Sequence, residues 1–212
     1  MKQYGIFPIA LLALACLAAC GRSPQPNYYL LETTQPMIAP LPGDRPGAVL
    51  RQVTLPPYLD RDALVLRSGG AVRIVVAEYH LWAEHLNKAV PRLLEANMRP
   101  LLQENGFNLL WPDMTDTALQ IDADLLRLDG SPGGTANISA RWRILDMEGT
   151  LLAQGVFARE TDAGSSHESM VQTLSCLLAD FGRELAQAAC GAFEQLAVQS
   201  RNSAQKKKGK HR

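Results

Sequence analysis

The sequence predicts a single α+β domain, in which an antiparallel (mixed) sheet has helices packed on one face. Residues 136–144 alternate apolar and polar side chains, the pattern of a strand with one buried face. Residues 82–103 and 165–196 repeat apolar side chains every three or four positions, the period of a helix. Without the signal peptide described next, the chain keeps 193 residues, enough for one core but not for two.

Residues 1–19 have the pattern of a bacterial lipoprotein signal peptide. Lys2 precedes an apolar run over residues 6–19, which is shorter than a usual membrane span. Cys20 is the expected site of lipid attachment, and an ordinary secretory signal is the alternative. The residues expected to be recognised by the signal peptidase are Leu17, Ala18 and Ala19. Asp after the cysteine is the usual signal for retention in the inner membrane of Gram-negative bacteria, so Gly21 predicts an anchor in the outer membrane, on its periplasmic face.

Charge is distributed unevenly along the chain. Residues 20–200 contain 14 basic and 21 acidic side chains, whereas the segment from residue 201 onward contains six Lys or Arg and no acid. The sequence therefore predicts an acidic body and a basic disordered tail over residues 199–212. The tail residues that could reach an anionic surface are Lys206, Lys207, Lys208, Lys210 and Arg212. A role in nucleic-acid binding is not expected outside the cytoplasm.

The first half of the mature chain predicts a tether followed by short strands. Residues 20–47 contain six prolines, which favour an extended tether, although Tyr28–Leu31 is apolar enough for a first edge strand. The folded domain is expected over residues 48–198. A strand over residues 48–55 ends at Pro56 and Pro57. Two further strands, residues 63–67 and 72–77, are expected to form a hairpin through Ser68-Gly-Gly70.

The second half predicts a helix, a meander and a longer helix. Pro91 and Pro100 are expected to kink or divide the helix over residues 82–103, and a strand follows at 107–111. Short turns join the three strands of the meander, residues 119–128, 136–144 and 151–159. The final helix is expected to begin at Ser165, with Glu168 completing a capping box.

Several groups of reactive side chains have simple structural explanations. Ser165, His167 and Glu168 are nucleophile, base and acid types, but neighbours on one helical turn cannot form a relay, so capping is expected. His80 and His85 lie five residues apart without a thiolate pair, so no metal site is expected. No cofactor and no enzymatic activity are predicted.

Cys176 and Cys190 remain after removal of the signal peptide. They lie fourteen residues apart on one predicted helix, roughly 21 Å at about 1.5 Å per residue, so they cannot form a disulfide. Two alternatives stay open: a second layer or subunit covers them, or both are exposed reactive thiols.

Two short segments are the candidates for partner contact, because each places an aromatic residue beside charges next to proline or at a helix start. The candidate residues are Tyr58, Leu59, Asp60, Arg61, Trp82 and Glu84. The alternative is structural: Tyr58 and Trp82 would fill the edge of the core, while Asp60 and Glu84 would cap turns or helices.

Several segments in order also carry a family resemblance: Val53-Thr-Leu-Pro-Pro-Tyr-Leu-Asp-Arg61, Leu64-Val-Leu-Arg67, Trp82-Ala-Glu84, Arg92-Leu-Leu and Asn97-Met98. Together with Tyr28-Tyr-Leu-Leu31 and the long final helix, they resemble the PqiC-like auxiliary lipoproteins of ABC-type transport systems over about residues 20–197. The chain departs from the family pattern at His85, where Pro is expected, and in the tail after Ser200.

The resemblance implies a non-enzymatic lipoprotein that pairs with a membrane-anchored MCE-domain protein and moves lipid between the inner and outer membranes. It also implies a homo-oligomer around the exit of such a system. The alternative is a periplasmic lipid carrier or chaperone, which would need an internal cavity. Trp142 and Phe157, which are expected to point inward, favour a filled core instead.

Overall fold

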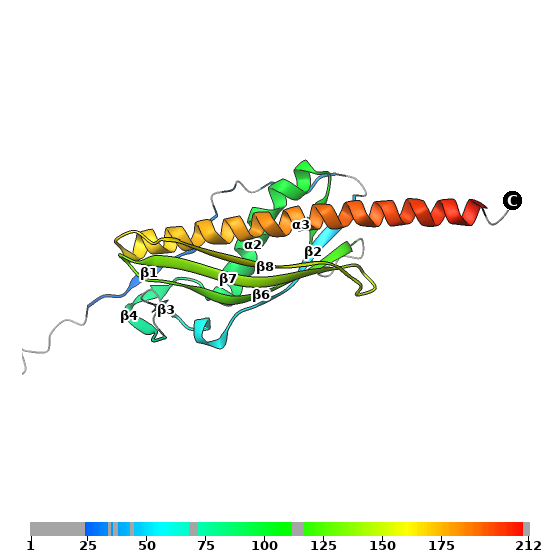
Figure 1. Cartoon of the computed structure of the whole chain (residues 1–212). Coiled ribbons are helices and arrows are strands. Elements are labelled where there is room, and N and C mark those ends of the chain that lie inside the picture. The colour runs from blue at the N-terminus through cyan, green and yellow to red at the C-terminus, as the bar shows by residue number, and fades with distance from the viewer. Residues whose placement is uncertain are drawn as a thin grey trace, which may run out of the picture.

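The computed structural model describes residues 24–33, 35, 38–42, 45–67, 72–111 and 117–209, with side chains described to residue 202. The predicted signal peptide, Cys20 and the tail residues Lys210 and Arg212 lie outside these ranges. Figure 1 shows a sheet covered by helices on one face, as predicted. The fold is a single α+β domain with a mixed eight-stranded sheet.

The predicted meander is confirmed as strands β6 (Thr117–Gly130), β7 (Thr135–Leu145) and β8 (Leu151–Asp162), which pair antiparallel in sequence order. The alternation in β7 has the predicted effect, since Ala136, Ile138, Ala140 and Ile144 are buried and Trp142 is half-buried. The intervening side chains point to the opposite face of the sheet.

The other edge of β6 pairs with two separate strands. The first part of β6 runs parallel to β2 (Gly47–Thr54), which also pairs in parallel with β5 (Asn108–Leu110). At its far end β6 meets β3 (Ala63–Leu66) through Gly130. These parallel pairs make the sheet mixed.

The sheet is completed at this far end of β6 by two more strands. β4 (Val75–Trp82) pairs antiparallel with β3, as the predicted hairpin requires, and β1 (Asn27–Tyr29) pairs in parallel with β4. Trp82 ends β4, which corrects its predicted place at a helix start. The reason is pairing: the Trp82 amide donates to the carbonyl oxygen of Asp62 at 2.6 Å, which keeps the chain extended.

The helices α2 (Leu86–Glu104) and α3 (His167–Gly209) bury their apolar stripes against the sheet and against each other. α2 continues through both prolines as one helix, so the predicted division does not occur. α3 is capped one residue later than predicted: the Ser169 amide donates to Oγ of Ser166 at 3.0 Å, and the Ser166 amide donates to Oγ of Ser169 at 3.0 Å.

Two predicted boundaries are also corrected. α3 continues through Gly209, so the backbone of residues 199–209, including that of Lys206, Lys207 and Lys208, is helical rather than disordered. Alanine, glutamine and lysine are good helix formers and extend a helix that tertiary packing has already nucleated. Part of the predicted tether is packed as well, since Leu31 is 1 % exposed and Asn108 hydrogen-bonds both backbone groups of Leu41.

Candidate functional site: two contact surfaces

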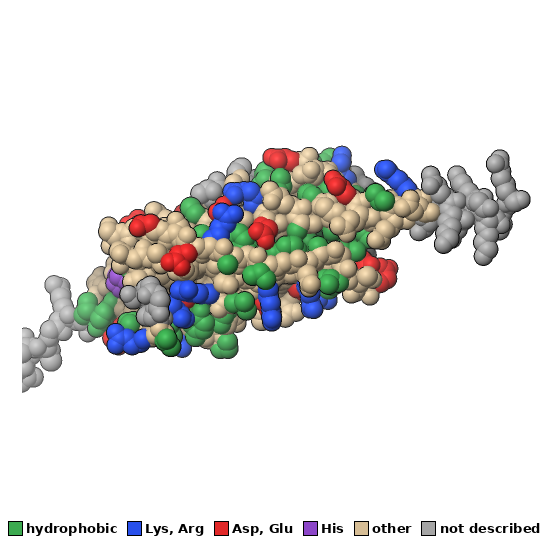
Figure 2. Space-filling model, viewed as in Figure 1, with side chains coloured by type: hydrophobic (Ala, Val, Ile, Leu, Met, Phe, Trp, Pro, Cys, Tyr) green, Lys and Arg blue, Asp and Glu red, His purple; other side chains and the backbone are tan. Residues whose placement is uncertain are grey.

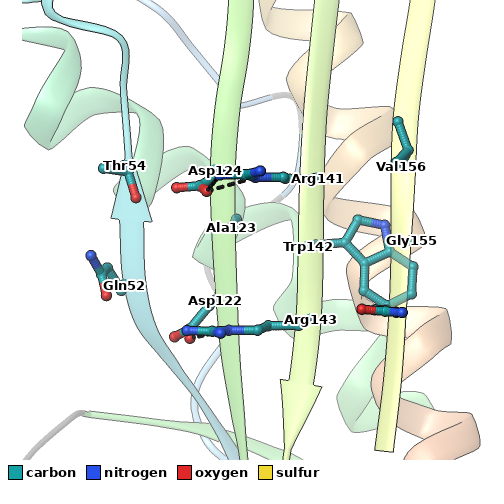
Figure 3. Close-up of a pocket in the computed structure, with 11 residues that line it drawn as sticks. Gln52, Thr54, Asp122, Ala123, Asp124, Arg141, Trp142, Arg143, Gly155 and Val156 are labelled. Carbon is teal, nitrogen blue, oxygen red and sulfur yellow. Dashed lines mark hydrogen bonds and ion pairs between the residues drawn. The ribbon is translucent and has the colours of Figure 1, made fainter. Parts of the chain in front are cut away.

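The sheet face opposite the helices carries polar and charged side chains, and we call it the open face. It holds a shallow hollow of about 830 Å³. The side chains that point from the strands into this region include Gln52, Thr54, Asp122, Asp124, Arg141, Arg143, Gln154 and Val156. Figure 3 shows acidic and basic side chains facing one another across β6 and β7.

Of the two acids that line the hollow, Asp122 is the more enclosed, with a side chain that is 10 % exposed against 35 % for Asp124. It accepts hydrogen bonds from Nε of Arg51 at 2.8 Å and from Nε of Arg143 at 2.9 Å, and Nη2 of Arg51 binds its second oxygen. Burial favours a raised pKa, but the bonds from both guanidinium groups outweigh it and hold the pKa of Asp122 below its ordinary value. Asp122 therefore stays ionised and fixes the two arginines.

Asp124 repeats this arrangement two residues further along β6. Nε of Arg141 donates to its Oδ2 at 2.9 Å. The pKa of Asp124 lies below its ordinary value, mainly because of a hydrogen bond from Thr54 and also because of Arg141. Arg141 remains 66 % exposed and Arg143 55 % exposed, so their guanidinium groups are fixed on one side and accessible on the other.

The open face was not among the predicted sites, although its pattern was present in the sequence. Cross-strand pairing places Asp122 opposite Arg143 and Asp124 opposite Arg141. Two acids at alternate positions before a turn, and two arginines at alternate positions after it, predict such pairs once the hairpin is recognised. Arg51 could not be found in this way, because it reaches Asp122 from β2, a strand distant in sequence.

The predicted contact residues lie at the other candidate surface, around β1, β4 and the start of α2. Leu59 is 2 % exposed and Trp82 is 9 % exposed, so both serve the core edge. Tyr58 belongs to the short helix η1 (Pro57–Leu59) and lies under the guanidinium of Arg67, 5.8 Å from the ring centroid. Arg67 in turn pairs with the buried Asp129 at 3.1 Å. These aromatic residues therefore have structural contacts.

The charged candidates remain accessible and lie near one another in the fold. Asp60 accepts a hydrogen bond from Asn87 in the first turn of α2 at 3.4 Å. Glu84 pairs with Arg92 at 2.7 Å. Arg61 is exposed. The structure thus brings the two predicted segments together, and their charged members are available for contact while Tyr58, Leu59 and Trp82 support them.

The histidines weighed as metal ligands have different surroundings. His80 stacks on His167 with ring centroids 3.7 Å apart, and its Nδ1 is hydrogen-bonded to the hydroxyl of Tyr29 at 2.8 Å. Burial and, to a lesser extent, the neighbouring His80 lower the pKa of His167. His85 lies apart at the start of α2, 3.4 Å from Asp62. Within the described ranges, no group of three or more His, Cys, Asp and Glu side chains is arranged to hold a metal ion.

The two cysteines differ in exposure, and both are free. Cys176 is exposed on α3, whereas Cys190 is half-buried and packs against the core. Burial, followed by the nearby Glu194, raises the pKa of the Cys190 thiol. In this domain Cys176 is therefore the more accessible thiol.

The space between α3 and the sheet is occupied by side chains. Phe157 of β8 stacks against Phe181 of α3 with ring centroids 5.2 Å apart, and both are buried. The Trp142 indole also points to this side and donates to Oε1 of Glu184 at 2.9 Å. In the part of the chain that the structure describes, no helix combines the length and apolar character of a membrane span.

Comparison with solved structures shows the same fold in other proteins. One crystal structure, of an uncharacterized protein, matches with a TM-score of 0.64 and 22 % identity, covering 77 % of this chain and 98 % of that one. A second, of a Xanthomonas campestris protein, matches with a TM-score of 0.59 and 11 % identity, covering 82 % and 98 %. These identities support the fold alone. A search of curated proteins found no match.

The family comparison covers most of the domain. The family model described as "ABC-type transport auxiliary lipoprotein component" matches residues 29–186. This range begins in β1 and ends within α3, so it includes the open face, η1 and the start of α2. The family is generally non-enzymatic. The chain therefore belongs to the family of auxiliary lipoprotein components of ABC-type transport systems.

Proposed function

We propose that this protein is anchored by Cys20 to the periplasmic face of the outer membrane and docks an MCE-domain protein of an ABC-type transport system. The system moves lipid between the inner and outer membranes and supports envelope integrity. The protein acts by contact rather than by catalysis, as a homo-oligomer around the exit of the system. Family membership and the lipoprotein signal pattern support this proposal.

The observation that carries the docking proposal is the open face. A mixed sheet that leaves one face without helices needs either water or a partner over that face. Here the face holds a shallow hollow, and its charged groups are oriented before any partner arrives. Preorganised charge lowers the ordering cost of association and favours specific partners.

The sign of the charge on the open face indicates the partner's chemistry. Three arginines, Arg51, Arg141 and Arg143, surround two aspartates, Asp122 and Asp124. This surface therefore has an excess of positive charge on a body that is acidic overall. We expect an acidic region on the docking protein, and we expect Asp60, Arg61 and Glu84 to contribute at the edge.

The test is site-specific photocrosslinking in intact envelopes with lipidated Cys20. A photoreactive residue replaces exposed Gln154 on the open face, or exposed Glu194 on α3 as the matched control. We expect an MCE-domain protein, together with self-crosslinks, from position 154 and little from position 194. Equal recovery from both positions, or no MCE-domain protein from either, would contradict docking at the open face.

Charge reversal separates docking from misfolding. Arg141→Glu combined with Arg143→Glu should reduce recovery of the partner by about tenfold or more, because like charges then face each other. Arg183→Glu is the control, since Arg183 is an exposed arginine of α3 that pairs with Asp180. All variants should retain a folded-state melting transition.

The carrier alternative makes a different prediction for the same sample. A carrier would release lipid on extraction of the purified protein. It would crosslink neither to an MCE-domain protein nor to another copy of itself. The stacked Phe157 and Phe181 occupy the place where an acyl chain would lie between helix and sheet, which favours docking.

A further inference from the structure

The β1–β4 pair exposes two aromatic side chains although it belongs to the folded domain. Tyr28 of β1 lies in register with Leu81 of β4, and Tyr79 stands two residues before Leu81 on the same strand. Tyr28 is 64 % exposed and Tyr79 is 44 % exposed. Figure 2 shows hydrophobic side chains at this end of the molecule, beside the point where the chain enters.

The opposite face of the same strand pair is firmly held. Tyr29 and Trp82 lie in register there, and the hydroxyl of Tyr29 is hydrogen-bonded to His80. The amide of Ala83 donates to the carbonyl oxygen of Tyr29 at 2.7 Å. The strand pair is therefore an ordered edge whose outer aromatic residues are presented by a fixed backbone.

The distance along the chain to Cys20 determines what this surface can meet. Asn27, the first residue of β1, lies seven positions after Cys20, and a fully extended chain spans at most about 3.6 Å per residue. The start of β1 is therefore within about 25 Å of the anchored cysteine. This step rests on the proposed function, because it assumes lipidation of Cys20.

We propose that the exposed aromatic surface formed by Tyr28 and Tyr79 contacts the headgroup region of the bilayer that holds the lipid anchor. Tyrosine suits this region, since its ring is apolar and its hydroxyl remains hydrated. The acyl chains attach the protein, and the surface orients it. With a second contact beside the anchor, the domain has a preferred tilt on the membrane, and the open face has a defined direction.

The test uses the mature lipoprotein in vesicles of phosphatidylethanolamine and phosphatidylglycerol. Cys176→Ser and Cys190→Ser remove the other thiols, and Tyr28→Cys or Tyr79→Cys carries a fluorescent label. The matched control is Trp111→Cys, because Trp111 is 66 % exposed and follows β5. β5 pairs with β2 near the start of β6. The β1–β4 pair is joined through β3 to Gly130, the last of the 14 residues of β6, so the control lies at the other end of that strand.

Lipids brominated near the headgroup should quench the labels at residues 28 and 79 several-fold more than the label at residue 111. Equal quenching at all three positions, with the protein still floating with the vesicles, would overturn the inference and leave the anchor in place. Failure of the lipoprotein to float would overturn both the anchor and this inference. Labels at 28 and 79 that respond only to an added MCE-domain protein would assign the surface to a protein partner instead.

Folding is checked separately for each labelled variant. Tyr28, Tyr79 and Trp111 are exposed, so their replacement should leave the melting temperature close to that of the parent. A Tyr28→Ser and Tyr79→Ser double variant, labelled through Asn27→Cys at the exposed start of β1, should then show reduced quenching while remaining bound to the vesicles. Unchanged quenching in that variant would contradict a contribution of the tyrosines.

Discussion

The indole of Trp142 lies over Gly155, its partner on β8, so closely that a β-carbon built at Gly155 would come within 2.5 Å of Cζ2. The indole points toward α3, where it donates to Glu184. A glycine in the middle of a strand thus makes room for the indole of Trp142, and the pair joins the meander to the helix.

Gly155→Ala should destabilise the domain by about 1–3 kcal/mol, because the indole or the strand must move to admit a methyl group. Urea unfolding followed by circular dichroism measures the change. Gly191→Ala, in α3, is the matched control, since a β-carbon there has nothing within 4 Å. It should instead stabilise by about 0.5–1 kcal/mol through helix propensity. Destabilisation of similar size in both variants would contradict this account.

Asp122→Asn should lower the free energy of unfolding by about 1–3 kcal/mol. The amide removes the negative charge between Arg51 and Arg143, which would then face each other. Asp124→Asn should have a smaller effect, since the Asp124 side chain is 35 % exposed and solvent screens its pair with Arg141. Chemical denaturation of both variants compares them directly. A larger loss from Asp124→Asn would show that Asp122 does not hold the open face together.

The thiols should react in a fixed order. Cys176 is exposed, whereas Cys190 is half-buried with a raised pKa, so its thiolate is scarcer and less accessible at neutral pH. Stopped-flow reaction with a disulfide reagent should give two phases, and Cys176→Ser should remove the faster one. Protection of Cys176 in the intact envelope, but not in the monomeric domain, would support a subunit or partner over α3. Loss of the slower phase in Cys176→Ser would reverse the assignment.

Stability should fall in mild acid because of the stacked histidines. The pKa of His167 is lowered in the folded state, so the unfolded chain binds this proton more tightly. The contribution of His167 to the free energy of unfolding is therefore complete above pH 6.5, the ordinary pKa of histidine, and it declines as the pH decreases below 6.5. His167→Gln should reduce the difference in melting temperature between about pH 7.5 and about pH 5.5.

His85→Gln is the comparison for that experiment, because His85 lies outside the stack of His80 and His167. The acidic Glu168 and the hydroxyl of Tyr29 also lie near the stack and remain in both variants. If His167→Gln and His85→Gln changed the pH dependence equally, the stack would not be its cause.

The sequence predicted what depends on neighbours along the chain. Alternation and short turns are local, and β6, β7 and β8 followed from them with their faces correctly oriented. Trp82 was misplaced, because an aromatic residue before a helical period can end a strand or begin a helix, and the bond to Asp62 that decides the matter joins distant segments. The pairing of Arg51 with Asp122 escaped prediction for the same reason. Tyr58 looked like a contact residue because Arg67, whose guanidinium covers its ring, follows β3 and is not adjacent to Tyr58 in the sequence.

Because α3 continues beyond the sheet as one helix, its last side chains point in a fixed direction relative to the domain. The helix has 43 residues and is about 65 Å long at about 1.5 Å per residue. Figure 1 shows its end projecting past the strands. Because about 3.6 residues make one turn, inserting one residue after Val198 would rotate everything beyond it by about 100°. Inserting seven residues would nearly restore the original direction at a greater reach. If the tail were disordered, inserting one residue and inserting seven residues would have the same effect on the direction of its side chains.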